Sequence, residues 1–386
     1  MLNLFIFLVA GGSIMETRLR SLVKSLTWRV LGIVILAILA WIFTGSWEQT
    51  TLITVTFHTI RVVLYYFHER LWLRIRWGIV KYDYKGIKQL YPKVRKKIGE
   101  RISAFIALMR PFTILGAIIA GFSLNYYFSI VSGTPTTFLQ SLIIGLVLGF
   151  LQAGGQALNQ GIIEEILIDR INGKTYRPTV KGLISPDEAL VFATYLFLAG
   201  ITLAFCLNFQ SGFIAILIAL FAITYSAPPL RVKKFFLVNN IHQGIARGLL
   251  PALYVSSLYG CQTKGLLFGI PLAIWVTGAQ ASKDFGDEKG DKKFGIMTFP
   301  VKLGREKALK LMWILMIASF SLYNIMVGLL LVPLKFVILN ILVLPSIFIV
   351  YALKRDIKTE KMENNLGWVA FYGTLSLFYL LSPLLA

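Results

Sequence analysis

Two groups of acidic residues stand out as candidates for chemistry. The first comprises Glu164, Glu165 and Asp169, and the second comprises Asp284, Asp287 and Asp291. Both groups follow long apolar stretches, and carboxylates beside hydrocarbon are costly enough to be functional candidates by default. If the two groups face each other they would hold Mg²⁺, which in proteins usually also binds the phosphate oxygens of a substrate. We therefore predict a magnesium site for a phosphate-bearing substrate.

The second group has helical spacing within Lys283-Asp-Phe-Gly-Asp-Glu-Lys-Gly-Asp291. Asp287 and Asp291 are four residues apart, and Asp284 is three before Asp287, so all three would share one helix face. The carboxylates there repel one another unless a cation neutralises them. Glycines 286 and 290 permit the close approach of a ligand. The alternative is a solvated loop balanced by its lysines.

In the first group, Glu165 and Asp169 share a helical face and Glu164 points away. Asn159 could add a neutral oxygen ligand. We expect these acids at the C-terminal end of a helix, where the helix dipole favours cations instead. Their placement there argues slightly against the alternative, a purely water-facing helix end. The predicted metal ligands are Glu165, Asp169, Asp287 and Asp291.

Basic residues suited to phosphate follow a diproline in Tyr225-Ser-Ala-Pro-Pro-Leu-Arg-Val-Lys-Lys234. Arg231 and Lys233 would project at the interface, where they could hold phosphate oxygens. The alternative is that they only mark the cytoplasmic end of a span. Arg247 lies inside an apolar stretch, and such a residue pairs with another group or faces a wet cavity.

The composition is that of an integral membrane protein, with 56% hydrophobic residues and a formal net charge of +21. The basic residues lie in short loops between apolar stretches, which is the positive-inside pattern, so we expect a lipid bilayer and no nucleic acid as partner. Stretches able to span the membrane are Leu26–Thr44, Thr51–Phe67, Pro111–Ile130, Thr137–Leu158, Ala189–Leu207, Gly212–Ala227, Val238–Tyr259, Gly265–Gln280, Ala308–Leu331, Phe336–Leu353 and Gly367–Leu385.

The loops of one side carry most of the basic residues, and those of the other side are short and nearly uncharged. This alternation predicts a multi-pass cell-membrane protein with a cytoplasmic N-terminus and an outside C-terminus. Both acidic groups and the Arg231–Lys234 segment then share the cytoplasmic face, which supports a single active site. The expected fold is an all-α polytopic membrane protein, with an N-terminal two-helix hairpin and a nine-helix transmembrane bundle.

We predict four segments along the chain. Residues 1–15 form an N-terminal extension of uncertain status, since Met15 could be the true start. Residues 16–80 form a two-helix membrane domain, residues 81–102 a basic cytoplasmic linker, and residues 103–386 the nine-helix domain.

The motifs of the nine-helix domain resemble those of the UbiA superfamily of intramembrane prenyltransferases. The matching pieces, in order, are Arg110-Pro111-Phe-Thr, Asp169-Arg-Ile-Asn172, Arg177-Pro178 with Gly182, Tyr225-Ser-Ala-Pro-Pro-Leu-Arg-Val-Lys233, the Lys283–Asp291 sequence, and Thr298-Phe-Pro-Val-Lys-Leu-Gly304. The first family motif usually has Asn, then Asp four residues later, then Asp after another four. This chain has Gly161 and Glu165 before Asp169, a departure that puts the metal geometry of the first group in doubt. The residues before the linker resemble a separate, uncharacterised two-helix membrane domain.

The resemblance implies transfer of an isoprenyl group from an isoprenyl diphosphate to a lipophilic or amphipathic acceptor: an aromatic quinone precursor, a tetrapyrrole or a glycerol-phosphate lipid. Mg²⁺ and basic side chains would neutralise the departing diphosphate in a dry site. We predict catalytic roles for Asp284, Asp287, Asp291, Glu165 and Asp169. Diphosphate contacts are predicted for Lys233, Arg231, Arg177, Lys283 and Tyr225. Arg110, Asn159 and Arg247 are predicted to line the substrate cavity.

Two other functions fit the same residues. Intramembrane carboxylates and Arg247 also suit an ion- or proton-coupled transporter, although a transport site should lie near mid-membrane. Gly161 suggests instead a catalytically inactive membrane scaffold. Metal binding separates the enzyme from the scaffold, and substrate-driven diphosphate release separates the enzyme from the transporter.

Overall fold

The computed structural model describes residues 27–28, 32, 36, 98–357 and 364–386. The chain divides into two units, Met1–Leu90 and Tyr91–Ala386, and the second contains nearly all described residues. The predicted hairpin Leu26–Phe67 lies outside the described residues except for four of its positions. Every element assigned in the described part of the chain is helical, as predicted.

Eight helices of the second unit are long and apolar enough to cross a membrane. They confirm a multi-pass membrane protein, because a chain in lipid must satisfy its backbone polar groups within helices. The spans are α5 (Pro111–Ser132), α6 (Phe138–Gly161), α8 (Pro186–Leu207), α9 (Phe209–Ser226), α12 (Gln262–Ala279) with its continuation to Lys293, α15 (Arg305–Gly328), η5 with α16 (Leu334–Lys354), and α17 with η6 (Leu366–Leu385).

The remaining predicted span of this unit, Val238–Tyr259, is a helical run with a π-helical turn at its centre. It comprises α10 (Val238–Gly244), the π-turn η3 (Ile245–Leu249) and α11 (Leu250–Ser257). Such turns widen a helix locally and often occur at functional sites. Here the turn contains Arg247. A Cβ atom built on Gly248 would lie 2.6 Å from the Ala273 Cα of α12, so glycine is what lets these two helices touch.

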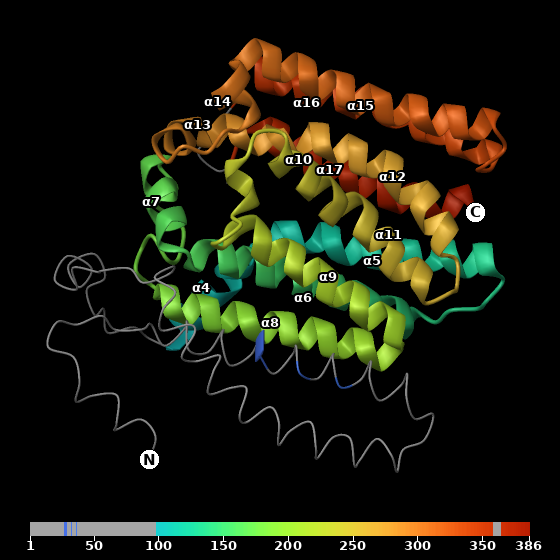
Figure 1. Cartoon of the computed structure of the whole chain (residues 1–386), viewed down its shortest axis with the longest axis horizontal. Helices are drawn as coiled ribbons and strands as arrows, with labels where there is room; N and C mark the ends of the chain where they lie inside the picture. The colour runs from blue at the N-terminus through green and yellow to red at the C-terminus, as the bar shows by residue number, and fades with distance from the viewer. Residues whose placement is uncertain (1–26, 29–31, 33–35, 37–97, 358–363) are drawn as a thin grey trace, which may run out of the picture. The chain divides into compact units, whose positions relative to one another are not determined.

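Shorter helices connect the spans at the end of the bundle that holds both acidic groups. These are α4 (Ile98–Met109), α7 (Ile163–Ile171), η2 (Val232–Lys234), η4 (Gln280–Lys283), α13 (Asp284–Lys293) and α14 (Phe299–Leu303). Figure 1 shows α7, in green, and α13 and α14, in orange, gathered at one end of the long helices. The first acidic group is thereby carried by the short helix α7, and the second by α13, the last part of the span that begins with α12.

One sequence expectation about the first group was wrong. The helix that carries Gly161 does not continue to Asp169, because Ile162 is extended (φ −81°, ψ 124°) and a new helix, α7, begins at Ile163. Glu164 and Glu165 therefore lie in the first turn of α7, where the helix dipole favours negative charge, and not at a C-terminal end.

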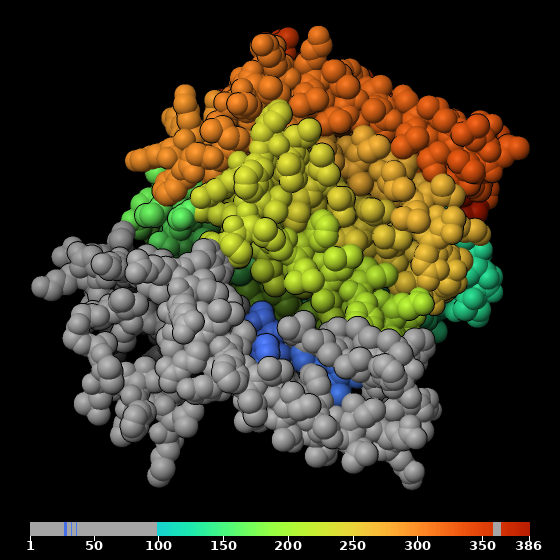
Figure 2. Space-filling model, in the orientation of Figure 1, coloured from blue at the N-terminus to red at the C-terminus, as the bar shows by residue number. Residues whose placement is uncertain are grey.

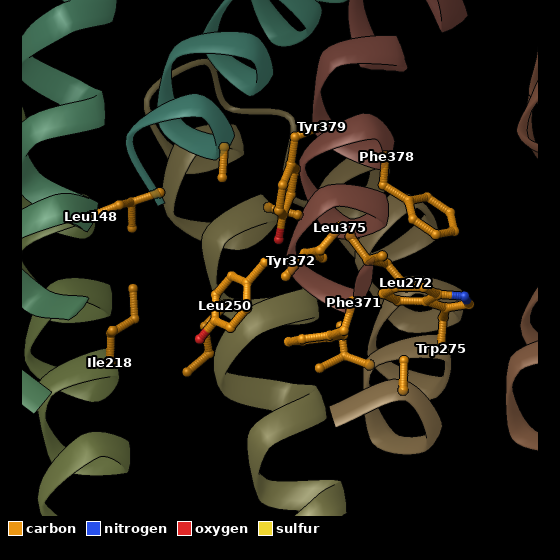
Figure 3. Packing of buried hydrophobic residues seen from close by; sticks show 14 of the residues in the cluster. Leu148, Ile218, Leu250, Leu272, Trp275, Phe371, Tyr372, Leu375, Phe378 and Tyr379 are labelled. Carbon is orange, nitrogen blue, oxygen red and sulfur yellow. The ribbon is translucent and has the colours of Figure 1, made fainter. Parts of the chain in front are cut away.

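Aromatic packing between α12 and α17 forms one wall of the bundle. Trp275 stacks on Phe371 with ring centroids 5.8 Å apart, contacts Phe378 at 5.0 Å, and donates a hydrogen bond to Ser346 Oγ at 2.9 Å. Figure 3 shows these rings on one side of α17, whereas the hydroxyls of Tyr372 and Tyr379 point to the other side. The space-filling view shows the yellow segment with α10 and α11 lying beside the orange C-terminal helices (Figure 2).

Candidate active site

A cavity of about 180 Å³ opens inside the bundle beneath the two acidic helices. One end is lined by charged residues: Glu165, Asp169, Lys174, Arg177, Lys233, Lys283, Asp287 and Asp291. The other end is mostly apolar. Figure 3 shows Leu148 and Ile218 on the opposite side of this space from Tyr372 and Tyr379. The cavity can therefore take a molecule with an ionic head and a hydrocarbon tail.

In the first acidic group, Glu165 contacts two basic side chains, Arg231 and Lys233. Its side chain is 5% exposed, and its two oxygens accept hydrogen bonds from Arg231 at 2.6 Å and from Lys233 at 2.5 Å. Arg231 also pairs with Glu164. These contacts join α7 to the segment after the diproline, 66 and 68 residues away.

Lys233 is a fixed positive charge at the cavity wall. Burial works to lower the pKa of Lys233, but the neighbouring Glu165 and Asp291 carboxylates outweigh it and raise that pKa above its ordinary value. The ammonium thus stays protonated at neutral pH. It can balance negative charge from either acidic helix.

Asp169 and Asp287 are bridged by cations from the loop that follows α7. Arg177 pairs with Asp169 at 3.1 Å, and Lys174 pairs with Asp287 while lying 3.9 Å from Asp169. The two acidic groups, more than one hundred residues apart in sequence, are therefore neighbours in space, as the sequence predicted. Their mutual repulsion is offset by the lysine and arginine between them.

On α13, the three aspartates do not have equal access to the cavity. Asp287 and Asp291 line it, whereas Asp284 does not and is only 3% exposed. Asp284 lies 3.8 Å from the ammonium of Lys283, which in turn donates a hydrogen bond to the Tyr225 hydroxyl at 2.5 Å. Lys283 also lies over the Tyr225 ring, 4.9 Å from its centroid.

A second set of polar side chains also lines the cavity. Arg247 donates to Gln243 Oε1 at 2.9 Å and to the Tyr372 hydroxyl, and the Tyr379 hydroxyl donates to the Arg247 carbonyl. Arg110 donates to Gln156 Oε1 at 3.0 Å and stacks over Trp368. Both arginines line the cavity, which is the place predicted for them.

Of the predicted site residues, all but Asp284 and Arg231 line the cavity. Sequence reasoning missed a further set of cavity-lining residues: Lys174, Gln243, Gln280, Asn364 and, from α17, Trp368, Tyr372 and Tyr379. Lys174 had a signal, since it lies between Asp169 and Arg177 in a segment already singled out. Asn364 had none, because no pattern around it points to the acidic helices.

The departure at Gly161 has a packing explanation. A Cβ atom there would lie 2.6 Å from Leu190 Cγ of α8, so this chain has no room for a side chain at that position. Asn159 lines the cavity, and its amide nitrogen donates to Ser226 Oγ at 3.1 Å. Its carbonyl oxygen is the end of the amide suited to a metal ion.

The donor set fits Mg²⁺ rather than a softer metal. Within the described residues no group of three or more His, Cys, Asp or Glu side chains forms a cage that could hold a metal ion by itself. Lys174 and Lys233 form ion pairs with Asp287 and Glu165. Mg²⁺ does not need such a cage, since it usually takes one or two carboxylates and completes its shell with water and substrate phosphate. Gln280, whose buried Oε1 has no hydrogen-bond partner among the described residues, adds a neutral oxygen at the cavity.

Residues 104–381 match the model of the UbiA prenyltransferase family. The chain belongs to this family. Residues 22–73 match a second family, described as a predicted membrane protein, DUF2061. Both matches confirm the resemblances that the motifs indicated.

Known relatives agree with the family match. Digeranylgeranylglyceryl phosphate synthase of Methanocaldococcus jannaschii is 28% identical over 273 residues, which is 69% of this chain and 89% of the relative. The chloroplastic chlorophyll synthase of Oryza sativa subsp. japonica is 32% identical over 149 residues, 36% of this chain and 39% of the relative.

A solved UbiA homologue from Archaeoglobus fulgidus, bound to GPP and Mg²⁺, superposes with a TM-score of 0.59 at 18% identity. The superposition covers 73% of this chain and 98% of the homologue. At this identity the likeness establishes a shared fold. The likeness confirms the predicted all-α polytopic class. The family match supports the predicted prenyltransferase over a transporter.

Proposed function

We propose that the chain transfers an isoprenyl group from an isoprenyl diphosphate to a lipophilic acceptor with the help of Mg²⁺. The observation that carries this proposal is the junction of two acidic helices and four basic side chains at the ionic end of an apolar cavity. The diphosphate would lie at the charged end, and the hydrocarbon chain would extend toward Leu148 and Ile218.

Asp169, Asp287 and Asp291 are the residues we propose to hold Mg²⁺, with Glu165 beside them. Mg²⁺ bound there supplies Lewis-acid stabilisation of the leaving diphosphate. Lys233, Lys283 and Arg177 would bind phosphate oxygens, and their charges stabilise the negative charge that develops as the carbon–oxygen bond breaks. The apolar cavity walls exclude water, which would otherwise capture the allylic cation in place of the acceptor.

Arg231 and Asp284 take supporting roles in this proposal. Arg231 holds Glu164 and Glu165, and so fixes α7 against the diproline segment. Asp284 lies beside Lys283 and directs its ammonium toward Tyr225 and the cavity. Removing Arg231 would leave Glu165 with Lys233 as its remaining cation, and removing Asp284 would take away one of the charges that compensate the buried Lys283 ammonium.

For the acceptor we propose a glycerol-phosphate lipid. The relative named digeranylgeranylglyceryl phosphate synthase aligns along most of its length, whereas the chlorophyll synthase aligns over 39% of its own. A second cavity, of about 230 Å³, shares Arg110 and Arg177 with the main one, and guanidinium groups suit the phosphate of such an acceptor. A tetrapyrrole acceptor is the second candidate, on the strength of the chlorophyll synthase match.

An acceptor panel tests this proposal. Purified protein in lipid nanodiscs would be given radiolabelled geranylgeranyl diphosphate, Mg²⁺, and either a prenylglyceryl phosphate, a tetrapyrrole carboxylic acid or an aromatic quinone precursor. We expect labelled product with the glyceryl phosphate acceptor. Product only with the tetrapyrrole would replace the acceptor assignment, and no product with any acceptor and no diphosphate release would overturn the reaction class.

We propose that the charged end of the cavity faces the cytoplasm. The support is the concentration of basic residues in the loops on that side, which the positive-inside rule places in the cytoplasm. In a chain whose Cys206 and Cys261 are replaced by serine, Lys289→Cys should react with a membrane-impermeant thiol reagent only after the cells are opened. Labelling of intact cells would reverse the orientation.

A further inference from the structure

Helix α13 is contacted by two asparagines from two different loops. Asn172, in the loop after α7, accepts a hydrogen bond from the Gly290 backbone N–H at 2.8 Å, and its amide nitrogen lies 3.5 Å from Asp287 Oδ1 as a donor. Its amide thus touches both the backbone of α13 and one of the cavity aspartates. The Asn172 side chain therefore joins the loop after α7 to α13.

Asn364, just before α17, makes the second contact near the start of α13, beside Lys283 and Gly286. Its amide nitrogen donates to the Lys283 carbonyl at 3.4 Å, and its carbonyl oxygen accepts from the Asn365 backbone N–H at 2.8 Å. Asn365 is 2% exposed, donates to the Ser282 carbonyl at 2.8 Å, and caps α17 by accepting from the Trp368 N–H. The start of α17 is therefore fastened to the turn that leads into α13.

The other end of the α16–α17 connection is linked to the same helix indirectly, through Arg305 of α15. Arg305 donates to the Leu353 carbonyl at 3.0 Å and to Asp356 at 2.9 Å, and its guanidinium lies 5.3 Å from the centroid of the Phe285 ring. Phe285 belongs to α13 and is 4% exposed. Asn364 thus contacts α13 directly, whereas the end of α16 is linked to it through Arg305 of α15.

The two glycines of the acidic sequence lie directly under the two asparagines. A Cβ atom on Gly286 would lie 2.2 Å from Asn364 Oδ1, and one on Gly290 would lie 2.7 Å from Asn172 Nδ2. Any larger residue would push the asparagine away. The sequence suggested that these glycines admit a ligand; the structure shows that each admits an asparagine of the chain itself.

We propose that Asn172 and Asn364 are positioning residues that hold α13 so that Asp287 and Asp291 face Asp169 and Glu165 across the cavity. The physical need is clear: the carboxylates repel one another, and two glycines weaken α13, so its orientation must be imposed from outside. The inference rests on the proposed Mg²⁺ site and assigns the residues that set its geometry. Asparagines in this position act as outer-shell partners, whose loss typically weakens metal binding ten- to one-hundred-fold.

Two double-mutant cycles test the proposal, with Mn²⁺ as a spectroscopic probe for the Mg²⁺ site. Electron paramagnetic resonance would measure Mn²⁺ binding to full-length protein in nanodiscs for Gly286→Ala, Asn364→Ala and the double variant, and for Gly290→Ala, Asn172→Ala and their double variant. Matched controls are Gly373→Ala, a helical glycine with open space around it, and Asn340→Ala, which removes an asparagine pair with Asn324 away from the cavity. Asn364→Leu, of similar size but without the amide, replaces Asn364→Ala if that variant does not insert.

We expect each single variant to weaken Mn²⁺ binding by about ten-fold or more, with both controls unchanged. Each double variant should lose little more than its singles, because the alanine acts by displacing the asparagine. Additive losses, or wild-type binding in the asparagine variants, would overturn the positioning role while leaving the proposed function intact. Absence of Mn²⁺ binding by the wild-type protein would overturn both.

Discussion

Lys174, in the loop after α7, forms an ion pair with Asp287 of α13 and lies 3.9 Å from Asp169 of α7. One ammonium group thus contacts an aspartate from each acidic group. The side chains of Lys174 and Asp287 are 9% and 19% exposed, so this contact is only weakly screened by solvent. Lys174 occupies the position of a cation between the two acidic helices, and a diphosphate entering the cavity offers it a second partner.

Replacing this lysine should separate metal binding from catalysis. In Lys174→Ala the aspartates lose a competing cation, so Mn²⁺ should bind as tightly as in wild type or more tightly. Turnover should nevertheless fall by about 10²-fold, because a charge that stabilises the leaving diphosphate is gone. Metal titration and steady-state kinetics on the same preparation would check this. Weaker metal binding together with normal turnover would contradict the role given to Lys174.

Lys233 should act on the diphosphate and not only on membrane topology. Lys233→Ala should raise the apparent KM for the isoprenyl diphosphate and lower kcat by about 10²-fold, because its charge matters most as the leaving group departs. The matched control is Lys354→Ala, an exposed lysine at the end of α16 that does not line the cavity. Equal effects of the two substitutions would reduce Lys233 to a positive-inside marker.

Restoring the usual family residue at position 161 should destabilise this chain. Gly161→Asn would drive its side chain into Leu190, and overpacking of this kind costs about 1–3 kcal/mol. The loss should appear as a lower melting temperature in detergent, and Leu190→Ala should recover part of it. If Gly161→Asn melts like the wild type and binds Mn²⁺ more tightly, the packing explanation for Gly161 fails.

The nine-helix domain should function without the preceding residues. A chain beginning at Lys97, just before α4, keeps every described residue that lines the cavity. We expect it to insert, remain monodisperse and retain turnover within about a factor of three of the full chain, since a domain with its own core can fold alone. A monodisperse but inactive product would show that the N-terminal unit contributes to the site.

The spans and the common location of the acidic groups could be predicted because hydrophobic length and loop charge are local properties of the sequence. Pro111, for example, begins α5 as expected for a proline in a first helical turn. The break at Ile162 could not be predicted, because an apolar residue there continues the hydrophobic pattern. The same holds for the partners of Glu165 and for the contact of Asn364 with α13, since these join residues 66, 68 and 81 positions apart. Such pairings depend on how the helices pack, which residue spacing alone does not specify.

The central claim is that the two acidic helices form one Mg²⁺-dependent prenyl diphosphate site, and Asp287→Asn tests it most directly. Diphosphate release from a labelled isoprenyl diphosphate would be measured with wild-type and Asp287→Asn protein, each with Mg²⁺ and with EDTA, after insertion has been verified. We predict that the wild type releases diphosphate only with Mg²⁺. In Asp287→Asn the rate of release should fall by about 10²-fold or more. A correctly inserted Asp287→Asn protein that turns over at the wild-type rate, or a wild type that is indifferent to EDTA, would contradict the account.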